Sequence, residues 1–112
     1  MINVALRCTY GPYYGARILD RYMPGWWNLI SLESLDMADP YECIAGQLFY
    51  DRSEHDFNGY TWFTSRQPGQ DGYITGVSQD LRMGLVPLDC YTDELLNETW
   101  REIIIERICQ FG

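Results

Sequence analysis

The sequence predicts a mainly α fold, in a single small domain of four or five helices over residues 1–112. A chain of 112 residues can bury one hydrophobic core without a metal or a disulfide. Hydrophobic residues make up 46% and aromatic residues 15% of the chain, which is too rich for a disordered protein. Helix start and stop signals recur along the chain, whereas the alternation typical of strands is short. At most one minor β element is therefore expected.

The N-terminal part is expected to contain an extended segment and then a helix. Apolar and polar residues alternate over residues 2–7, which is typical of an edge strand or of an extended arm over residues 1–11. Pro12 then suits the first turn of a helix, and Pro24-Gly25 ends that helix.

A second helix is predicted over residues 40–50. Asp39 has the chemistry of an N-cap, proline follows it at the first helical position, and Glu42 completes a capping box. The next stretch, residues 51–72, is polar with embedded aromatics and fits either a short helix or a strand. Another short helix is expected before Gly84, which would end it in the left-handed conformation.

The clearest helix is predicted near the C-terminus. Thr92-Asp93-Glu94 opens it with acidic side chains at the positive end of the helix dipole, and the helix extends to about Cys109. Side chains advance by about 100° per residue, so four apolar residues share one face and are expected to be buried. They are Leu96, Trp100, Ile103 and Ile104.

The opposite face of this helix has a carboxylate every four residues, at Glu94, Glu98, Glu102 and Glu106. Like charges at this spacing destabilise a helix by a few tenths of a kcal/mol per pair. Arg101 and Arg107 are expected to offset part of that repulsion. The row is either an ordinary solvated face or a surface that binds a partner.

The charge balance excludes some classes of partner. The chain has 16 acidic and 8 basic residues, and its formal net charge is -8. Nucleic acids and anionic membranes are therefore not expected as partners. No apolar run approaches the roughly 18 residues of a membrane span, and the N-terminus lacks the apolar run of a signal peptide. We expect a cytoplasmic protein with reduced thiols.

The cysteines are expected to be buried, unpaired thiols. They lie far apart along the chain, and no two of them form a Cys-x-x-Cys pair that would favour zinc. They are Cys8, Cys43, Cys90 and Cys109.

No catalytic, cofactor-binding or metal-binding residues are predicted. The signatures of nucleotide-binding proteins, serine hydrolases and zinc hydrolases are absent. The single histidine, His55, lies among acidic residues in an expected loop, which favours a solvated imidazole. Asp36, Asp39 and Glu42 are close in sequence, but a helix start explains the last two better than acid-base catalysis. Residues 51–56 lack the glycine and the terminal glutamate of a calcium-binding loop.

Five short motifs follow one another along the chain: GARILD, PGWWNLI, LESLD, CIAGQLF and TWREII. In this order they resemble a family of small proteins of actinobacterial phages, with a Gly-Ala-x-Leu-Asp helix, a Pro-Gly-Trp turn, a Leu-Asp element, a Cys-x-x-Gly-Gln element and a terminal Trp-Arg helix. The resemblance covers most of the chain and implies a phage or prophage origin, but no activity. Many members have a second cysteine three residues before the one that matches Cys43, where this chain has Pro40.

The resemblance also bears on the adjacent tryptophans of PGWWNLI. One tryptophan of the family follows Pro-Gly directly and matches Trp26, which implies a structural role for Trp26. Successive side chains diverge by about 100° in a helix, so Trp27 points elsewhere. Trp27 is expected either to be half-buried at the domain edge with its indole N–H in water, or to contact a partner.

These features favour a non-enzymatic acidic phage protein that binds a host protein in the cytoplasm of the bacterial host, and inhibition of that protein is one outcome that such binding can have. The candidate partner-binding residues are Trp27, Glu94, Glu98, Glu102 and Glu106. Three alternatives stay open: a nucleic-acid mimic that inhibits a DNA-binding host or defence protein, a structural or assembly protein, and an enzyme without a recognised motif. No cofactor is expected, and the sequence leaves the oligomeric state open.

Overall fold

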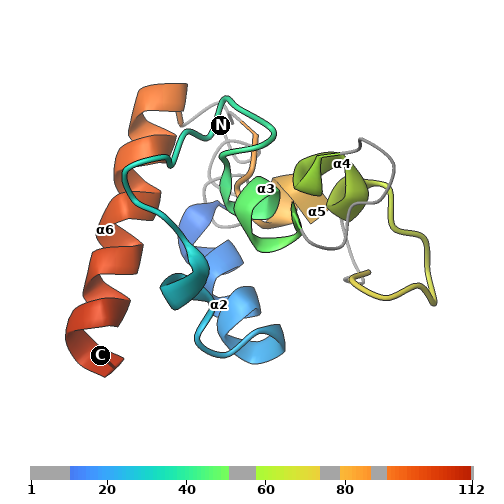
Figure 1. Cartoon of the computed structure of the whole chain (residues 1–112), viewed down its shortest axis with the longest axis horizontal. Coiled ribbons are helices and arrows are strands. Elements are labelled where there is room, and N and C mark those ends of the chain that lie inside the picture. Colours follow the sequence, from blue (N-terminus) through green and yellow to red (C-terminus); the bar gives the residue numbers. More distant parts are fainter. Residues whose placement is uncertain (1–10, 51–57, 74–78, 87–90, 112) are drawn as a thin grey trace, which may run out of the picture.

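The computed structural model describes residues 11–50, 58–73, 79–86 and 91–111, and these residues are mainly helical (Figure 1). They form five α-helices and one 3-10 helix, with no strand in the described ranges. The elements in order are α2 (Pro12–Tyr22), η1 (Trp26–Leu29), α3 (Ile44–Leu48), α4 (Gly59–Thr64), α5 (Gln79–Arg82) and α6 (Asp93–Phe111). The predicted mainly α fold is confirmed, and the expected arm over residues 1–11 lies outside the described residues except for Gly11.

The long helix α6 stands along one side of the molecule, and the short helices α3, α4 and α5 gather on the other side (Figure 1). Helix α2 and the 3-10 helix η1 pack against α6, and α3 packs against α4. The hydrophobic core lies between α6, α2 and η1 on one side and the short helices α3 and α4 on the other. One long exposed face of α6 therefore remains uncovered by other described elements.

Helix α2 forms as the sequence predicts. Pro12 occupies its first turn, and the buried face includes Ala16 and Leu19. Gly25 follows at a φ of 82°, in the left-handed region that favours glycine, and the chain then enters η1. The turn signal Pro24-Gly25 thus ends the helix where it was expected to end.

The start of the second predicted helix was wrong. The Asp39 carboxylate accepts a hydrogen bond from the backbone N–H of Tyr41 at 2.8 Å, which holds residues 39–41 in a turn instead of a helix. Such local bonds from aspartate compete with helix formation. Helix α3 begins only at Ile44, where the Cys43 Sγ accepts from the Gly46 N–H at 3.2 Å and acts as the N-cap.

The open choice between helix and strand after residue 57 is resolved as a helix. Asn58 caps α4, because its Oδ1 accepts from the backbone N–H of Thr61 at 2.7 Å. Phe63 of α4 stacks on Phe49, with ring centroids 4.9 Å apart. The short helix α5 also forms, and Gly84 follows it at a φ of 67°, as predicted for a left-handed cap.

Two tryptophans lie at the centre of the core. Trp26 and Trp100 are fully buried and meet edge to face, with ring centroids 5.8 Å apart. The Trp26 indole donates to Asp20 at 2.9 Å, and the Trp100 indole donates to the Gly84 carbonyl at 3.3 Å. The structural role expected for Trp26 is confirmed, because its ring joins η1 to α6.

Candidate interaction surface

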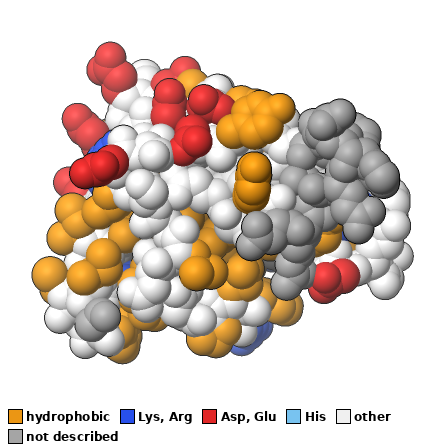
Figure 2. All heavy atoms as spheres, in the orientation of Figure 1, with side chains coloured by type: hydrophobic (Ala, Val, Ile, Leu, Met, Phe, Trp, Pro, Cys, Tyr) orange, Lys and Arg blue, Asp and Glu red, His pale blue; other side chains and the backbone are white. Residues whose placement is uncertain are grey.

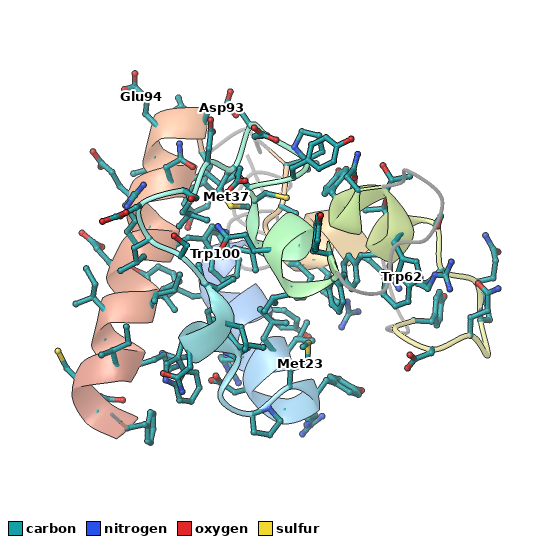
Figure 3. The ribbon with its side chains drawn as sticks, viewed as in Figure 1. Met23, Met37, Trp62, Asp93, Glu94 and Trp100 are labelled. Atoms are coloured by element: carbon teal, nitrogen blue, oxygen red, sulfur yellow. The ribbon has the colours of Figure 1, made fainter. Side chains whose placement is uncertain are left out.

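The exposed face of α6 brings together most of the predicted partner-binding residues. Thr92 caps the helix, because its Oγ1 accepts from the backbone N–H of Leu95 at 3.1 Å. The predicted apolar face is buried, with Trp100 turned towards the core, whereas Glu94 projects away from the molecule at the first turn (Figure 3). The buried side chains therefore fix how the helix is rotated about its axis. The side chains on its outer side are not constrained by packing against the core.

Three carboxylates lie on consecutive turns of this outer face: Glu94, Glu98 and Glu102, here named the acidic stripe. All three are exposed, and none has a hydrogen bond or an ion pair within the described part of the chain. Figure 2 shows acidic side chains gathered around the N-terminal half of α6. A helical rise of about 1.5 Å per residue places successive carboxylates about 6 Å apart along the axis.

The arginines that were expected to offset this stripe are engaged elsewhere. Arg101 donates from both terminal nitrogens to the backbone carbonyls of Leu32 and Leu35. Arg107 is largely buried and pairs with Asp20, with an Nη2–Oδ2 distance of 2.8 Å. These guanidinium groups fasten α6 to the rest of the fold, so the repulsion within the stripe is not relieved by ion pairs.

Glu106 differs from the other predicted glutamates. Four-residue steps advance by about 40° around the helix, so Glu106 lies about 120° from Glu94. Its carboxylate approaches Arg107 at 3.4 Å. The predicted row of four is thus a stripe of three and a separate, paired residue.

Trp27 does not have the surroundings that the sequence suggested. Its side chain is half-buried, but its indole nitrogen is fully buried and finds no acceptor among the described residues. The expectation that this N–H lies in water was wrong. The ring lies against Phe111, with centroids 5.5 Å apart, and meets Trp26 edge to face. Trp27 therefore supports the last turn of α6 more than it offers an anchor to a partner.

The C-terminal half of α6 contains an exposed apolar surface that the sequence reasoning missed. Ile105 is 50% exposed, Ile108 40% and Phe111 68%. Figure 2 shows hydrophobic side chains gathered over this part of the helix. The run Ile103-Ile104-Ile105 carried the signal, since three successive side chains cannot all face one core. Ile105, Ile108 and Phe111 are named the apolar end.

A cavity of about 390 Å³ lies between the turn before α3, α4 and the start of α6, and Cys43, Tyr60 and Asp93 line it together with apolar groups. Burial raises the pKa of the Cys43 thiol to about 11. Burial, and then the negative charge of Asp80, raise the pKa of Tyr60 to about 12. Both groups are therefore protonated at neutral pH, which argues against Cys43 as a nucleophile and favours its role as the cap of α3.

A smaller cavity, of about 160 Å³, lies beside α2 and the loop after α4. Leu19, Met23, Phe49 and Phe63 give it an apolar part, and Tyr22, Tyr73 and Asp71 also line it. Asp71 is its one charged lining residue.

The remaining sequence candidates for chemistry lie together in the loop before α3, where Asp36, Asp39 and Glu42 are joined by backbone hydrogen bonds. Asp36 and Asp39 accept backbone hydrogen bonds within a turn, at 3.0 and 2.8 Å, so their carboxylates hold the loop before α3. The residues that the structure describes contain no group of three histidine, cysteine or acidic side chains that could hold a metal ion. His55 and the acids of residues 51–56 lie outside those residues.

Comparison of the chain with known protein families, curated proteins and solved structures finds no match. Within the described residues, no helix is long and apolar enough to cross a membrane. The outer face of α6, with its acidic stripe and its apolar end, is the feature of this surface that the packing of the fold does not explain.

Proposed function

We propose that this chain is a non-enzymatic, phage-encoded protein that binds a host protein in the bacterial cytoplasm through the outer face of α6. The observation that carries the proposal is the acidic stripe of Glu94, Glu98 and Glu102, which is exposed and uncompensated. Carboxylates repeated at this spacing cost helix stability. Exposed carboxylates that cost stability and have no ion-pair partner are expected where their charge serves to bind another protein.

The chemistry of the stripe favours a partner with a basic surface. The formal net charge of -8 steers such a partner towards the chain over long range, and the row of carboxylates gives it a local site. Arg101 and Arg107 are held by the fold, so they do not compete with the partner's cations for the stripe.

Affinity capture from a host lysate, followed by titration of the purified captured protein, tests this function. We expect capture at low salt and its loss at high salt, because exposed charge pairs are screened. Glu98→Gln with Glu102→Gln should abolish capture. The matched control, Glu42→Gln with Asp71→Asn, removes the same charge away from α6 and should leave capture intact. Equal capture by both variants would contradict the proposal.

A second candidate function is mimicry of nucleic acid, in which the stripe occupies the DNA-binding surface of a host or defence protein. It is favoured by the regular spacing of the exposed carboxylates along one helix face. This version predicts that duplex DNA competes with the chain for the captured protein. Simultaneous binding of DNA and the chain would exclude mimicry while leaving the broader proposal standing.

A further inference from the structure

The cavity of about 390 Å³ beside the start of α6 is apolar inside and has a carboxylate at its rim. Buried side chains form its inner wall, namely Met37, Cys43 and Leu85, whereas Asp93 at its rim is exposed to solvent. Volumes of about 300 to 1,000 Å³ are typical of sites that bind small ligands. The cavity, here named the socket, therefore has room for one long side chain of another protein.

Hydrogen bonds hold the loop that forms one wall of the socket. The Met37 N–H donates to Oδ1 of Asn97, one turn after Asp93 on α6, at 2.6 Å. The Cys43 N–H donates to the Asp39 carbonyl at 2.8 Å. Met37 and Cys43 are therefore held in place before any ligand binds, and a preformed site loses less conformational entropy on binding.

The charge around the socket is negative. Asp93 is the one charged residue among the described lining residues, and it has no ion pair within the described part of the chain. Another lining residue, Tyr60, donates its hydroxyl to Asp80 at 3.5 Å. Beyond the effect of burial, the charge of Asp80 raises the pKa of Tyr60. The charge of Asp39 likewise helps to raise the pKa of Cys43. An apolar interior with this acidic rim suits a cation on an aliphatic stem.

We infer that the socket binds the side chain of one lysine or arginine of the basic partner, an inference that rests on the proposed function. The aliphatic stem packs against the apolar inner wall, and the ammonium or guanidinium group stays at the rim and pairs with Asp93. Asp93 directly precedes Glu94, and both lie in the first turn of α6 (Figure 3). A basic segment that follows the acidic stripe thus reaches the socket at the end of the stripe.

The smaller cavity beside α2 provides an internal comparison. It also combines apolar side chains with one carboxylate, that of Asp71, but its volume is only about 160 Å³. Met23 lines this cavity and Met37 lines the socket, and Figure 3 shows the two methionines well apart. Their methyl groups therefore report on the two cavities separately.

Titration of the full chain with n-butylammonium and with N-propylguanidinium, which reproduce the two side chains, tests the inference at constant ionic strength. The methyl signals of ¹³C-labelled methionine are followed by NMR. We expect a saturable shift of the Met37 signal, with a Kd of about 1 to 100 mM for ligands of so few atoms. Neutral n-butanol should bind more weakly. Equal shifts of Met23 and Met37, or n-butanol binding as tightly as n-butylammonium, would overturn the inference.

Asp93→Asn keeps the shape of the side chain and should weaken binding of n-butylammonium by about two- to fivefold, as for an exposed charge pair. The matched control, Asp71→Asn, removes the same charge at the smaller cavity and should leave the Met37 titration unchanged. An unchanged Kd in Asp93→Asn would contradict the pairing.

The titration needs no host partner, so the two proposals fail separately. If no probe shifts the Met37 signal while Glu98→Gln with Glu102→Gln still abolishes capture, the socket is rejected and the proposed function stands. A saturable Met37 shift in a chain that captures no partner would support cation binding by the socket and contradict the proposed function.

Discussion

The two halves of α6 share one buried side and differ in most of the large side chains on their outer side. The N-terminal half exposes Glu94, Glu98 and Glu102, and the C-terminal half exposes Ile105, Ile108 and Phe111. One helix therefore combines a surface suited to charged partners with one suited to apolar contact. The buried side of a helix thus accounts for the fold, whereas the side chains on its outer side are explained by what they contact.

The largest expected effect concerns the shared buried side. Trp100→Ala should lower the free energy of unfolding by about 3 to 5 kcal/mol, because the ring is fully buried against Trp26. Trp27→Ala should cost about half as much, because its ring is half-buried on Phe111. Urea unfolding measures both. Equal losses would show that Trp27 belongs to the core as fully as Trp100 does.

The next effect concerns what fastens the C-terminal half. Asp20 accepts hydrogen bonds from Arg107 and from the Trp26 indole, so Asp20→Ala should cost about 2 to 3 kcal/mol by leaving a buried guanidinium without its partner. Asp20→Asn should cost less, since it keeps an acceptor. Glu106→Ala removes only an exposed contact of Arg107 and should change stability by less than about 0.5 kcal/mol. If Glu106→Ala lowered the free energy of unfolding as much as Asp20→Ala does, Asp20 would not be the main partner that holds Arg107.

Alkaline pH should affect the part of the fold around α3 and α4. The pKa of Cys43 is raised from 9.0 to about 11 and that of Tyr60 from 10.0 to about 12. Between those values the unfolded chain releases protons that the folded chain retains, so stability should be full below pH 9 and fall as the pH rises towards 11 and 12. Urea midpoints measured across this range check it. Tyr60→Phe should flatten the fall above pH 10, and an unchanged slope would contradict the assignment.

Two cysteine thiols differ in their exposure to solvent, one in the core and one near the end of α6. Cys109 lies exposed on the last turns of α6, whereas Cys43 is buried. Maleimide should modify Cys109 rapidly at neutral pH and Cys43 only on unfolding, because reaction needs an accessible thiolate. Peptide mapping after short exposures measures the rates residue by residue. Comparable rates at the two positions would contradict the packing of α3.

Much of the fold could be predicted from the sequence, because local signals and packing agree there. Pro12 and Gly25 bound α2, and the buried stripe of α6 follows from its helical period. The start of α3 could not be predicted, because Asp39 was equally suited to cap a helix or to close a turn. Local contacts decided between the two, because the Cys43 Sγ caps α3 at the Gly46 N–H and Gly46 packs closely against the backbone of Pro40 and Tyr41.

The candidate surface was predicted only in its acidic part. Glutamates at a spacing of four residues are visible in the sequence, but the loss of their compensating arginines is not, since Arg101 and Arg107 are engaged by carbonyls and a carboxylate from distant segments. The apolar end was missed because the sequence analysis assigned Ile105 and Ile108 to neither face of the helix. Only the position of η1 beside α6 shows how far the burial extends.

The acidic stripe is expected to serve binding and not the fold, so its removal should have the smallest effect on stability. The free energy of unfolding of Glu98→Gln with Glu102→Gln is measured by urea unfolding at low salt. We predict that it equals the wild-type value or exceeds it by a few tenths of a kcal/mol, because helix repulsion is removed. A loss of more than about 1 kcal/mol would show that these carboxylates hold the structure together, and it would contradict the account.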